Sequence, residues 1–185
     1  MKTNQIKKLV YSGVFLALCL VLPFFTGQIP QIGSALLPMH LPVMLCGFVC
    51  GWPYGLAIGI ISPLLRSLLF GMPPMFPTAL AMSLELAGYG FFTGLLYRLF
   101  PKKVPFLYAN LVISMLAGRV LWGVARLVFA GVAGSEFAFA AFVAGAFTSA
   151  IPGIIVQLIL IPILVMALQR TKFMLNTGPA PVQAA

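Results

Sequence analysis

Ionisable side chains interrupt the apolar stretches of this sequence at four positions: Arg66, Glu85, Arg119 and Arg126. Arg119 and Arg126 are seven residues apart, two turns along one helix face, and Trp122 stands between them. Glu85 and Tyr89 form a similar pair at a spacing of four. Arginine can hold a carboxylate or phosphate with two parallel hydrogen bonds, and aromatic rings can stack on a flat ligand. These residues therefore indicate a binding pocket for a polar or anionic molecule.

Two uncharged polar residues extend this set. His40 is the only histidine, and it precedes an apolar run, where it could contact a ligand, gate a pocket or be purely structural. Gln157 lies in the last apolar run and could bind a ligand or another helix. A different interpretation stays open. In it, Glu85 and Arg119 form a structural ion pair, while Arg66 and Arg126 extend outward to the membrane surface.

The motifs of common enzymes are missing from the sequence. It has no GxxxxGK[ST] loop for ATP, no HExxH, no GxSxG and no paired carboxylates. Cys19, Cys46 and Cys50 lack the companion ligands of a zinc site, so we interpret them as small packing residues. We expect no metal, no cofactor and no catalytic residue. The sequence predicts a binding protein that takes its energy from a partner.

The amino-acid composition indicates whether these residues belong to a soluble protein or to a membrane protein. Hydrophobic residues make up 62% of the 185 positions and charged residues 7%, whereas soluble domains average about 45–50% and about 25%. The net charge of +9 would suggest a nucleic-acid partner for a soluble protein, but this chain lacks the polar surface for one. The composition excludes a soluble fold and predicts an integral membrane protein with no nucleic-acid partner.

A membrane helix needs about 20 apolar residues, so the length allows six spans with short loops. We predict an all-α protein with one membrane domain over residues 1–175 and a disordered tail over 176–185. The apolar runs that define its spans are Leu9–Phe25, Leu41–Cys50, Pro53–Phe70, Pro77–Phe100, Pro105–Gly131 and Phe137–Gln169. The last run is long enough to be tilted, to break near Pro152 or to extend beyond the bilayer. Leu41–Ile61 could instead be one span kinked at Pro53, which would give five spans.

The distribution of basic residues favours six spans. Eight of the eleven lie at the ends of runs: Lys2, Lys7, Lys8, Arg98, Lys102, Lys103, Arg170 and Lys172. Six spans place all of them on the cytoplasmic side, as the positive-inside rule requires, and five spans do not. Both termini are then cytoplasmic, and Thr26–His40 becomes a long, uncharged outer loop. This loop either folds back over the protein or rests on the membrane surface.

Glycines recur every four residues at Gly47, Gly51, Gly55 and Gly59. Small residues at this spacing let membrane helices approach closely, which predicts internal packing for this series. Gly13 and Ala17 form a single pair of the same kind in the first span. That helix is expected to be partly exposed, so the pair could pack internally or dock a partner helix.

The sequence resembles the substrate-binding S components of energy-coupling factor (ECF) transporters. His40-Leu41-Pro42 followed by GFVCGWPYG is similar to the second-helix pattern of that family, and Gly13/Ala17 resembles its docking motif. The resemblance implies a six-helix binder in the plasma membrane of a bacterium. It also implies three partner proteins, a transmembrane coupling subunit and two cytoplasmic ATPases. The binder would capture a vitamin-like molecule from outside, topple in the bilayer and release it inside.

Our interpretation from the residues is that Arg119 and Arg126 attract an anionic group, Trp122 and Tyr89 stack a ring, and Glu85 orients a donor. Pantothenate, folate-like compounds, pyridoxine or pyrimidine precursors and modified purine bases fit these residues, and an anionic or zwitterionic ligand ranks first. Two alternatives are a self-contained facilitator or channel and a small membrane enzyme. Either would function without ATPase partners.

Overall fold

The computed structural model describes residues 2–26, 35–132, 134, 150–171 and 173–176. Within these ranges the protein is helical, with six α-helices. The α-helices are α1 (Lys2–Val21), α3 (His40–Cys50), α4 (Trp52–Phe70), α5 (Leu80–Leu99), α6 (Val104–Val132) and α8 (Ile151–Gln169). A 3-10 turn, η1 (Leu22–Thr26), follows α1, and a π-helical turn, η2 (Met75–Ala79), precedes α5. The predicted all-α, six-helix architecture is confirmed.

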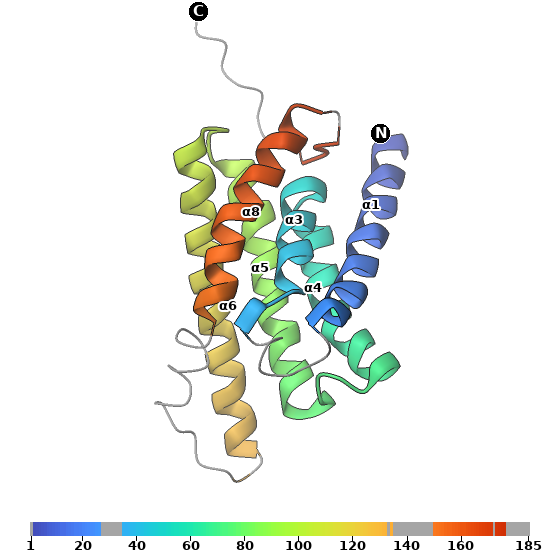
Figure 1. Ribbon diagram of the computed structural model, residues 1–185, viewed down its shortest axis with the longest axis vertical. Coiled ribbons are helices and arrows are strands. Elements are labelled where there is room, and N and C mark those ends of the chain that lie inside the picture. Colours follow the sequence, from blue (N-terminus) through green and yellow to red (C-terminus); the bar gives the residue numbers. More distant parts are fainter. Residues whose placement is uncertain (1, 27–34, 133, 135–149, 172, 177–185) are drawn as a thin grey trace, which may run out of the picture.

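Five of the helices are long and apolar enough to cross a membrane, and α3 is the exception. Its 11 residues extend only about 16 Å, half of a bilayer core. Figure 1 shows α3 inside the bundle, and it contacts α1, α4, α5 and α8. Ten of its residues are buried. Neighbouring helices rather than lipid therefore surround α3, which explains how so short a helix fits a membrane protein.

The chain reverses direction between α3 and α4 at Gly51. This residue has φ +102°, a conformation that a Cβ atom would strain, and its N–H donates to the carbonyl of Gly47. Pro53 follows in the first turn of α4, where a missing N–H costs nothing. The alternative of one span kinked at Pro53 is therefore wrong, because α3 and α4 are separate, oppositely directed helices (Figure 1).

The glycine series packs α3 and α4 against α5. A Cβ atom built on Gly55 would lie 2.4 Å from the Gly90 carbonyl oxygen, and one on Gly90 would lie 2.1 Å from that of Gly55. A Cβ on Gly47 would reach the Gly90 oxygen at 2.6 Å, and one on Gly59 the Leu86 oxygen at 2.4 Å. The predicted internal packing is confirmed, and its partners are backbone atoms of α5.

The pair in α1 lies in a different environment. Gly13 and Ala17 are exposed, and a Cβ on Gly13 would meet nothing within 4 Å. The opposite side of α1 packs inward through Ser12 and Cys19. All three cysteines are buried and none of them forms a disulfide among the described residues, as a packing role predicts. Packing inside the monomer therefore does not explain the Gly13/Ala17 pair.

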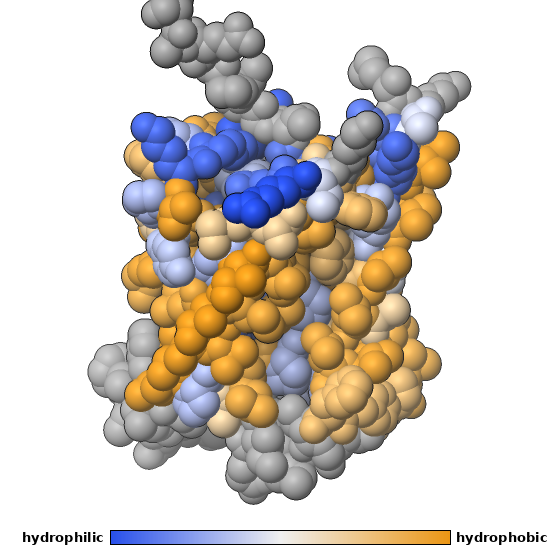
Figure 2. All heavy atoms as spheres, turned by 45° about the horizontal axis from the view of Figure 1, so that its top comes forward, coloured by the Kyte–Doolittle hydropathy of each residue, from blue (hydrophilic) through white to orange (hydrophobic). Residues whose placement is uncertain are grey.

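Basic side chains gather at the end of the bundle where α1 begins and α8 ends (Figures 1 and 2). We call this the basic end; its described side chains are Lys7, Lys8, Arg98, Lys102, Lys103 and Arg170. Below it, Figure 2 shows an apolar surface. The helix directions therefore bring together the residues that the positive-inside rule assigned to one side, and the cytoplasmic orientation of both termini stays a prediction.

Part of the predicted outer loop is described. Leu37 and Met39 are buried, and a Cβ on Gly153 of α8 would lie 2.6 Å from the Ala35 carbonyl oxygen. Residues 35–39 therefore fold back against α8, in agreement with the first of the two alternatives, whereas residues 27–34 lie outside the described ranges. The last predicted span is described from Ala150 onward, with Pro152 in the first turn of α8.

Asn176, the first residue of the predicted tail, packs against the bundle. Its side chain is buried, and its Nδ2 donates to the carbonyls of Gly47 at 3.3 Å and Gly94 at 3.0 Å. The N–H of Leu175 donates to the Val49 carbonyl at 2.9 Å. Leu175 thus satisfies a carbonyl that helix geometry leaves free at the end of α3. Asn176 links α3 to α5, because it bonds to a carbonyl of each helix. Residues 177–185 lie outside the described ranges.

Asn176→Ala should lower the free energy of unfolding by about 1–3 kcal/mol, because a buried side chain loses two hydrogen bonds, each worth about 0.5–1.5 kcal/mol. Thermal unfolding of the purified protein in detergent measures the change. Thr171→Ala is the matched control, since it removes an exposed hydrogen bond to Leu168 and should change stability by less than about 0.5 kcal/mol. Equal effects of the two substitutions would contradict the assigned role of Asn176.

Candidate functional site

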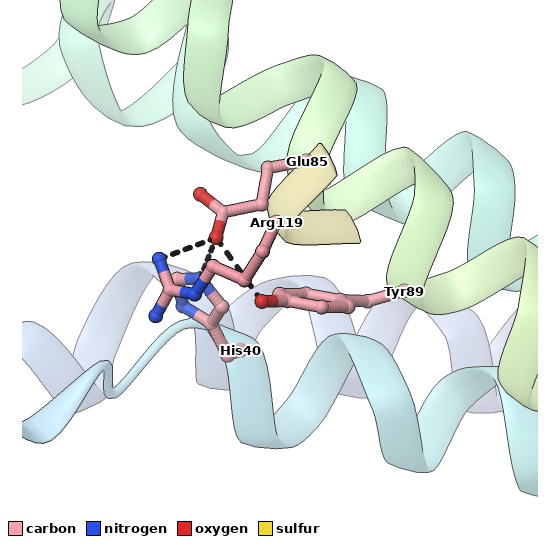
Figure 3. Close-up of polar contacts among 4 residues, drawn as sticks. All are labelled: His40, Glu85, Tyr89 and Arg119. Atoms are coloured by element: carbon pink, nitrogen blue, oxygen red, sulfur yellow. Dashed lines mark hydrogen bonds and ion pairs between the residues drawn. The ribbon is translucent and has the colours of Figure 1, made fainter. Parts of the chain in front are cut away.

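Four polar side chains from three helices meet inside the bundle, and we call them the polar cluster: His40, Glu85, Tyr89 and Arg119. One oxygen of Glu85, Oε1, is their common point (Figure 3). Arg119 Nη1 lies 2.7 Å from it, the Tyr89 hydroxyl donates to it at 3.1 Å, and His40 Nε2 lies 3.4 Å away. All four side chains are buried, with relative exposures between 1% and 6%. The polar cluster is therefore closed off from the surroundings in this conformation.

Local geometry explains why these residues meet. His40 is the first residue of α3, while Glu85 and Tyr89 are one turn apart on α5. Gly118 of α6 is directly beside Arg119, and a Cβ there would lie 2.3 Å from the Tyr89 ring. Only glycine leaves room for this ring between α5 and α6. The helix contact at Gly118 thus brings Arg119 within reach of Glu85.

The Glu85–Arg119 ion pair predicted as one alternative is present. Removing two charges from water costs several kcal/mol per ion, and their attraction offsets this only when the remaining polar atoms are also bonded. In the polar cluster that condition is not met. Nitrogen atoms Nε and Nη2 of Arg119 and both ring nitrogens of His40 are buried without a hydrogen-bond partner among the described residues. The polar cluster has more donors than acceptors.

Gln157 is another buried polar side chain. It is 1% exposed, and its Nε2 also lacks a partner in the described part of the chain. It lies one turn beyond Gly153 on the side of α8 that packs against residues 35–39. The hydrogen bonds and ion pairs within the polar cluster do not include Gln157, so its predicted role in binding stays a prediction.

Arg66 occupies a separate environment. Its Nη1 donates to the Leu20 carbonyl near the end of α1, and its guanidinium lies 4.9 Å from the centre of the Phe24 ring and 5.3 Å from that of Phe70. With 3% exposure it does not extend outward, so that expectation is wrong for Arg66. These contacts join α4 to the end of α1, and none of them involves the polar cluster.

Arg126 and Trp122 form a pair of their own on α6. The Arg126 guanidinium lies 5.9 Å from the centre of the Trp122 ring, and both side chains are partly exposed. They lie up to two turns beyond Arg119 along the helix. Tyr89 differs from Trp122, because its ring is covered by Gly118 and by His40 at a centroid distance of 5.2 Å. The Trp122 ring is therefore more exposed than the Tyr89 ring.

A line of hydrogen bonds that the sequence did not predict continues from the polar cluster toward the basic end. Thr93 Oγ1 donates to the Tyr89 carbonyl at 2.6 Å, Asn110 Nδ2 to the Thr93 carbonyl at 3.0 Å, and Ser114 Oγ to Asn110 Oδ1 at 3.0 Å. The spacing of four between Asn110 and Ser114 was the available signal. These bonds fix α5 against α6 and so hold Tyr89 and Arg119 in register.

The described residues contain no group of three side chains suited to a metal ion. A model of the ECF transporter substrate-specific component family matches residues 7–165 of the chain. Comparisons with curated proteins and with solved structures gave no match. The family match covers most of the helical bundle, including all four members of the polar cluster. The chain therefore belongs to the substrate-specific components of ECF transporters, which are multi-pass membrane proteins and non-enzymatic binding subunits that work with an ECF module.

Proposed function

We propose that this protein is the high-affinity binding subunit for uptake of a vitamin or a related cofactor precursor. Separate coupling and ATPase subunits would supply the energy. The observation that supports the proposal is the polar cluster. The chain belongs to a family of binding subunits. Inside its bundle, Glu85 and Arg119 form a buried ion pair. The other donor nitrogens of Arg119 have no hydrogen-bond partner among the described residues. A polar ligand would satisfy them.

The binding site would extend from the polar cluster to the Arg126–Trp122 pair. Arg119 and Arg126 lie seven residues apart on α6, so both can face one ligand. Trp122 would stack on a flat ring between them. Because the polar cluster is closed, ligand entry requires residues at the end opposite the basic end to move apart. The coupling subunit would dock elsewhere, on the exposed face of α1 that carries Gly13 and Ala17.

The most direct test identifies the small molecules that purify with the protein. We expect a vitamin or precursor to be released on denaturation and detected by mass spectrometry. Uptake of that molecule into vesicles should require the ECF module and ATP. Uptake by this chain alone would instead identify a facilitator, and purified protein that holds no such molecule and binds none would remove the proposal.

Glu85→Gln and Arg126→Ala should each weaken binding of the identified molecule by at least about tenfold while the protein stays folded. Glutamine adds an N–H donor where donors are already in excess, so it disorders Arg119 and Tyr89. Arg126→Ala removes a cation that attracts the ligand. Isothermal titration of the purified variants measures the change.

Arg98→Ala is the control, because Arg98 is an exposed arginine at the basic end. It should leave affinity unchanged. If Glu85→Gln and Arg126→Ala both bind as well as the unmodified protein, the ligand pocket lies elsewhere in the bundle.

A further inference from the structure

The donor nitrogens of Arg119 that do not contact Glu85 indicate which chemical group the ligand offers. Glu85 contacts Nη1, at 2.7 Å, whereas Nε and Nη2 are buried and have no hydrogen-bond partner among the described residues. Nε–H and one N–H of Nη2 point in parallel from the same edge of the planar group. Figure 3 shows one end of the guanidinium at the Glu85 carboxylate and another nitrogen directed away from it. One complete two-donor edge is therefore unused.

This edge matches an anion that presents two oxygens, as carboxylates and phosphates do. Two parallel N–H donors in a fixed plane fit the two oxygens of a carboxylate, and such charge-assisted pairs are about twice as strong as neutral hydrogen bonds. A neutral alcohol or a single carbonyl would fill only half of the edge. We propose that the transported molecule carries a carboxylate, which binds bidentately to Nε–H and Nη2–H of Arg119. This inference rests on the proposed function.

The charges around Arg119 allow such a partner. The ligand carboxylate would approach a different edge of the guanidinium from Glu85, so the cation lies between the two anions and separates them. Arg119 Nη1, the Tyr89 hydroxyl and His40 Nε2 surround Glu85 Oε1. His40 Nδ1 has no hydrogen-bond partner among the described residues, so it is available as a further polar contact. Arg126 adds a second positive charge on the same helix. Glu85 thus positions the guanidinium, and the ligand completes its hydrogen bonding.

The burial of Arg119 makes the unused edge significant. On a surface, water would bond to Nε and Nη2, and their lack of a protein partner would mean nothing. Arg119 is only 6% exposed, so a donor without a partner there has lost its bond to water and gained none in return. A carboxylate would replace the lost bond on binding. The same surplus of donors disfavours a purely cationic ligand, which would bring further donors.

The test uses pairs of compounds that differ only at the carboxylate: nicotinate and nicotinamide, pantothenate and pantothenol, biotin and biotin amide. Binding of each compound to the purified full-length protein is measured by titration and by thermal stabilisation. In at least one pair we expect the acid to bind about 10- to 100-fold more tightly than its neutral counterpart. Arg119→Lys, which keeps the charge but loses the two-donor edge, should clearly reduce that preference. Arg98→Lys should preserve it.

Each other outcome overturns the inference. The ligand class is wrong if neutral members bind as well as the acids, if no acid binds, or if Arg119→Lys keeps the preference. The comparison of acid with neutral compound needs only the unmodified protein, so it stands even if Arg119→Lys does not fold. A neutral vitamin that binds tightly and is delivered with the ECF module would overturn the carboxylate while leaving the proposed function intact. A protein that binds and releases nothing removes both.

Discussion

Gly90→Ala is expected to prevent α4 and α5 from reaching their native contact. The added Cβ would lie 2.1 Å from the Gly55 carbonyl oxygen and 2.3 Å from its carbon, which are backbone atoms of a packed helix. A side chain could rotate away, but a helix backbone cannot, so α4 and α5 must separate. Overpacking of cores costs about 1–3 kcal/mol when side chains can adjust, and here we expect at least the upper value.

The measurement is the yield of monodisperse protein in detergent, together with its thermal unfolding temperature. Gly131→Ala is the matched control, since the same methyl group there would meet nothing within 4 Å. Alanine also favours a helix over glycine by up to about 1 kcal/mol, so this control should be neutral or slightly stabilising. If Gly90→Ala is as stable as Gly131→Ala, the close approach of α4 and α5 is wrong.

Ala17→Trp is expected to abolish ATP-driven uptake while leaving ligand affinity unchanged. Ala17 and Gly13 are exposed on α1, and no part of the described monomer packs against Gly13 closely enough to require a glycine there. Small residues four apart allow two membrane helices to approach closely, and a tryptophan would hold them apart. The polar cluster lies on α3, α5 and α6, so binding should not change.

Uptake is measured in vesicles that contain the variant, the coupling subunit and both ATPases, and affinity is measured on the isolated variant. Val120→Trp provides the control, because Val120 is 61% exposed on α6 and a tryptophan there should face lipid. Normal transport by Ala17→Trp would remove α1 as the docking helix. Loss of transport by both variants would show a general effect of bulk on the membrane surface.

Much of the fold could be predicted because the membrane restricts the possible structures. Backbone groups in lipid must bond within their own helix, so apolar runs bounded by proline, glycine and charge predict helices directly. Pro53–Phe70 and Pro105–Gly131 agree with α4 and α6 to within one residue at each end. The α3–α4 hairpin was less certain, since 11 residues are too few for a span. The prediction that α3 and α4 are two helices rather than one came from the distribution of basic residues instead.

The two interpretations of the ionisable residues could not be separated from the sequence. Spacing places Glu85 and Arg119 on known helix faces, but it does not give the distance between two helices. The structure shows that the ion pair forms and that two nitrogens of Arg119 have no hydrogen-bond partner among the described residues, and ligand binding stays a prediction. Arg66 has the same residue type and a similar apolar context, yet it bonds to the end of α1. Its role depends on which helix packs beside it.

The sequence by itself determined the residue types, their order along each helix and the apolar character that forces those helices into a membrane. These properties depend on local spacing and composition, which need no knowledge of neighbours. Only the tertiary structure decided that Gly118 admits the Tyr89 ring, that Arg119 reaches Glu85, and that one edge of its guanidinium stays unused. Such contacts depend on how closely two helices approach and how they are rotated, and residues far apart in the chain set both.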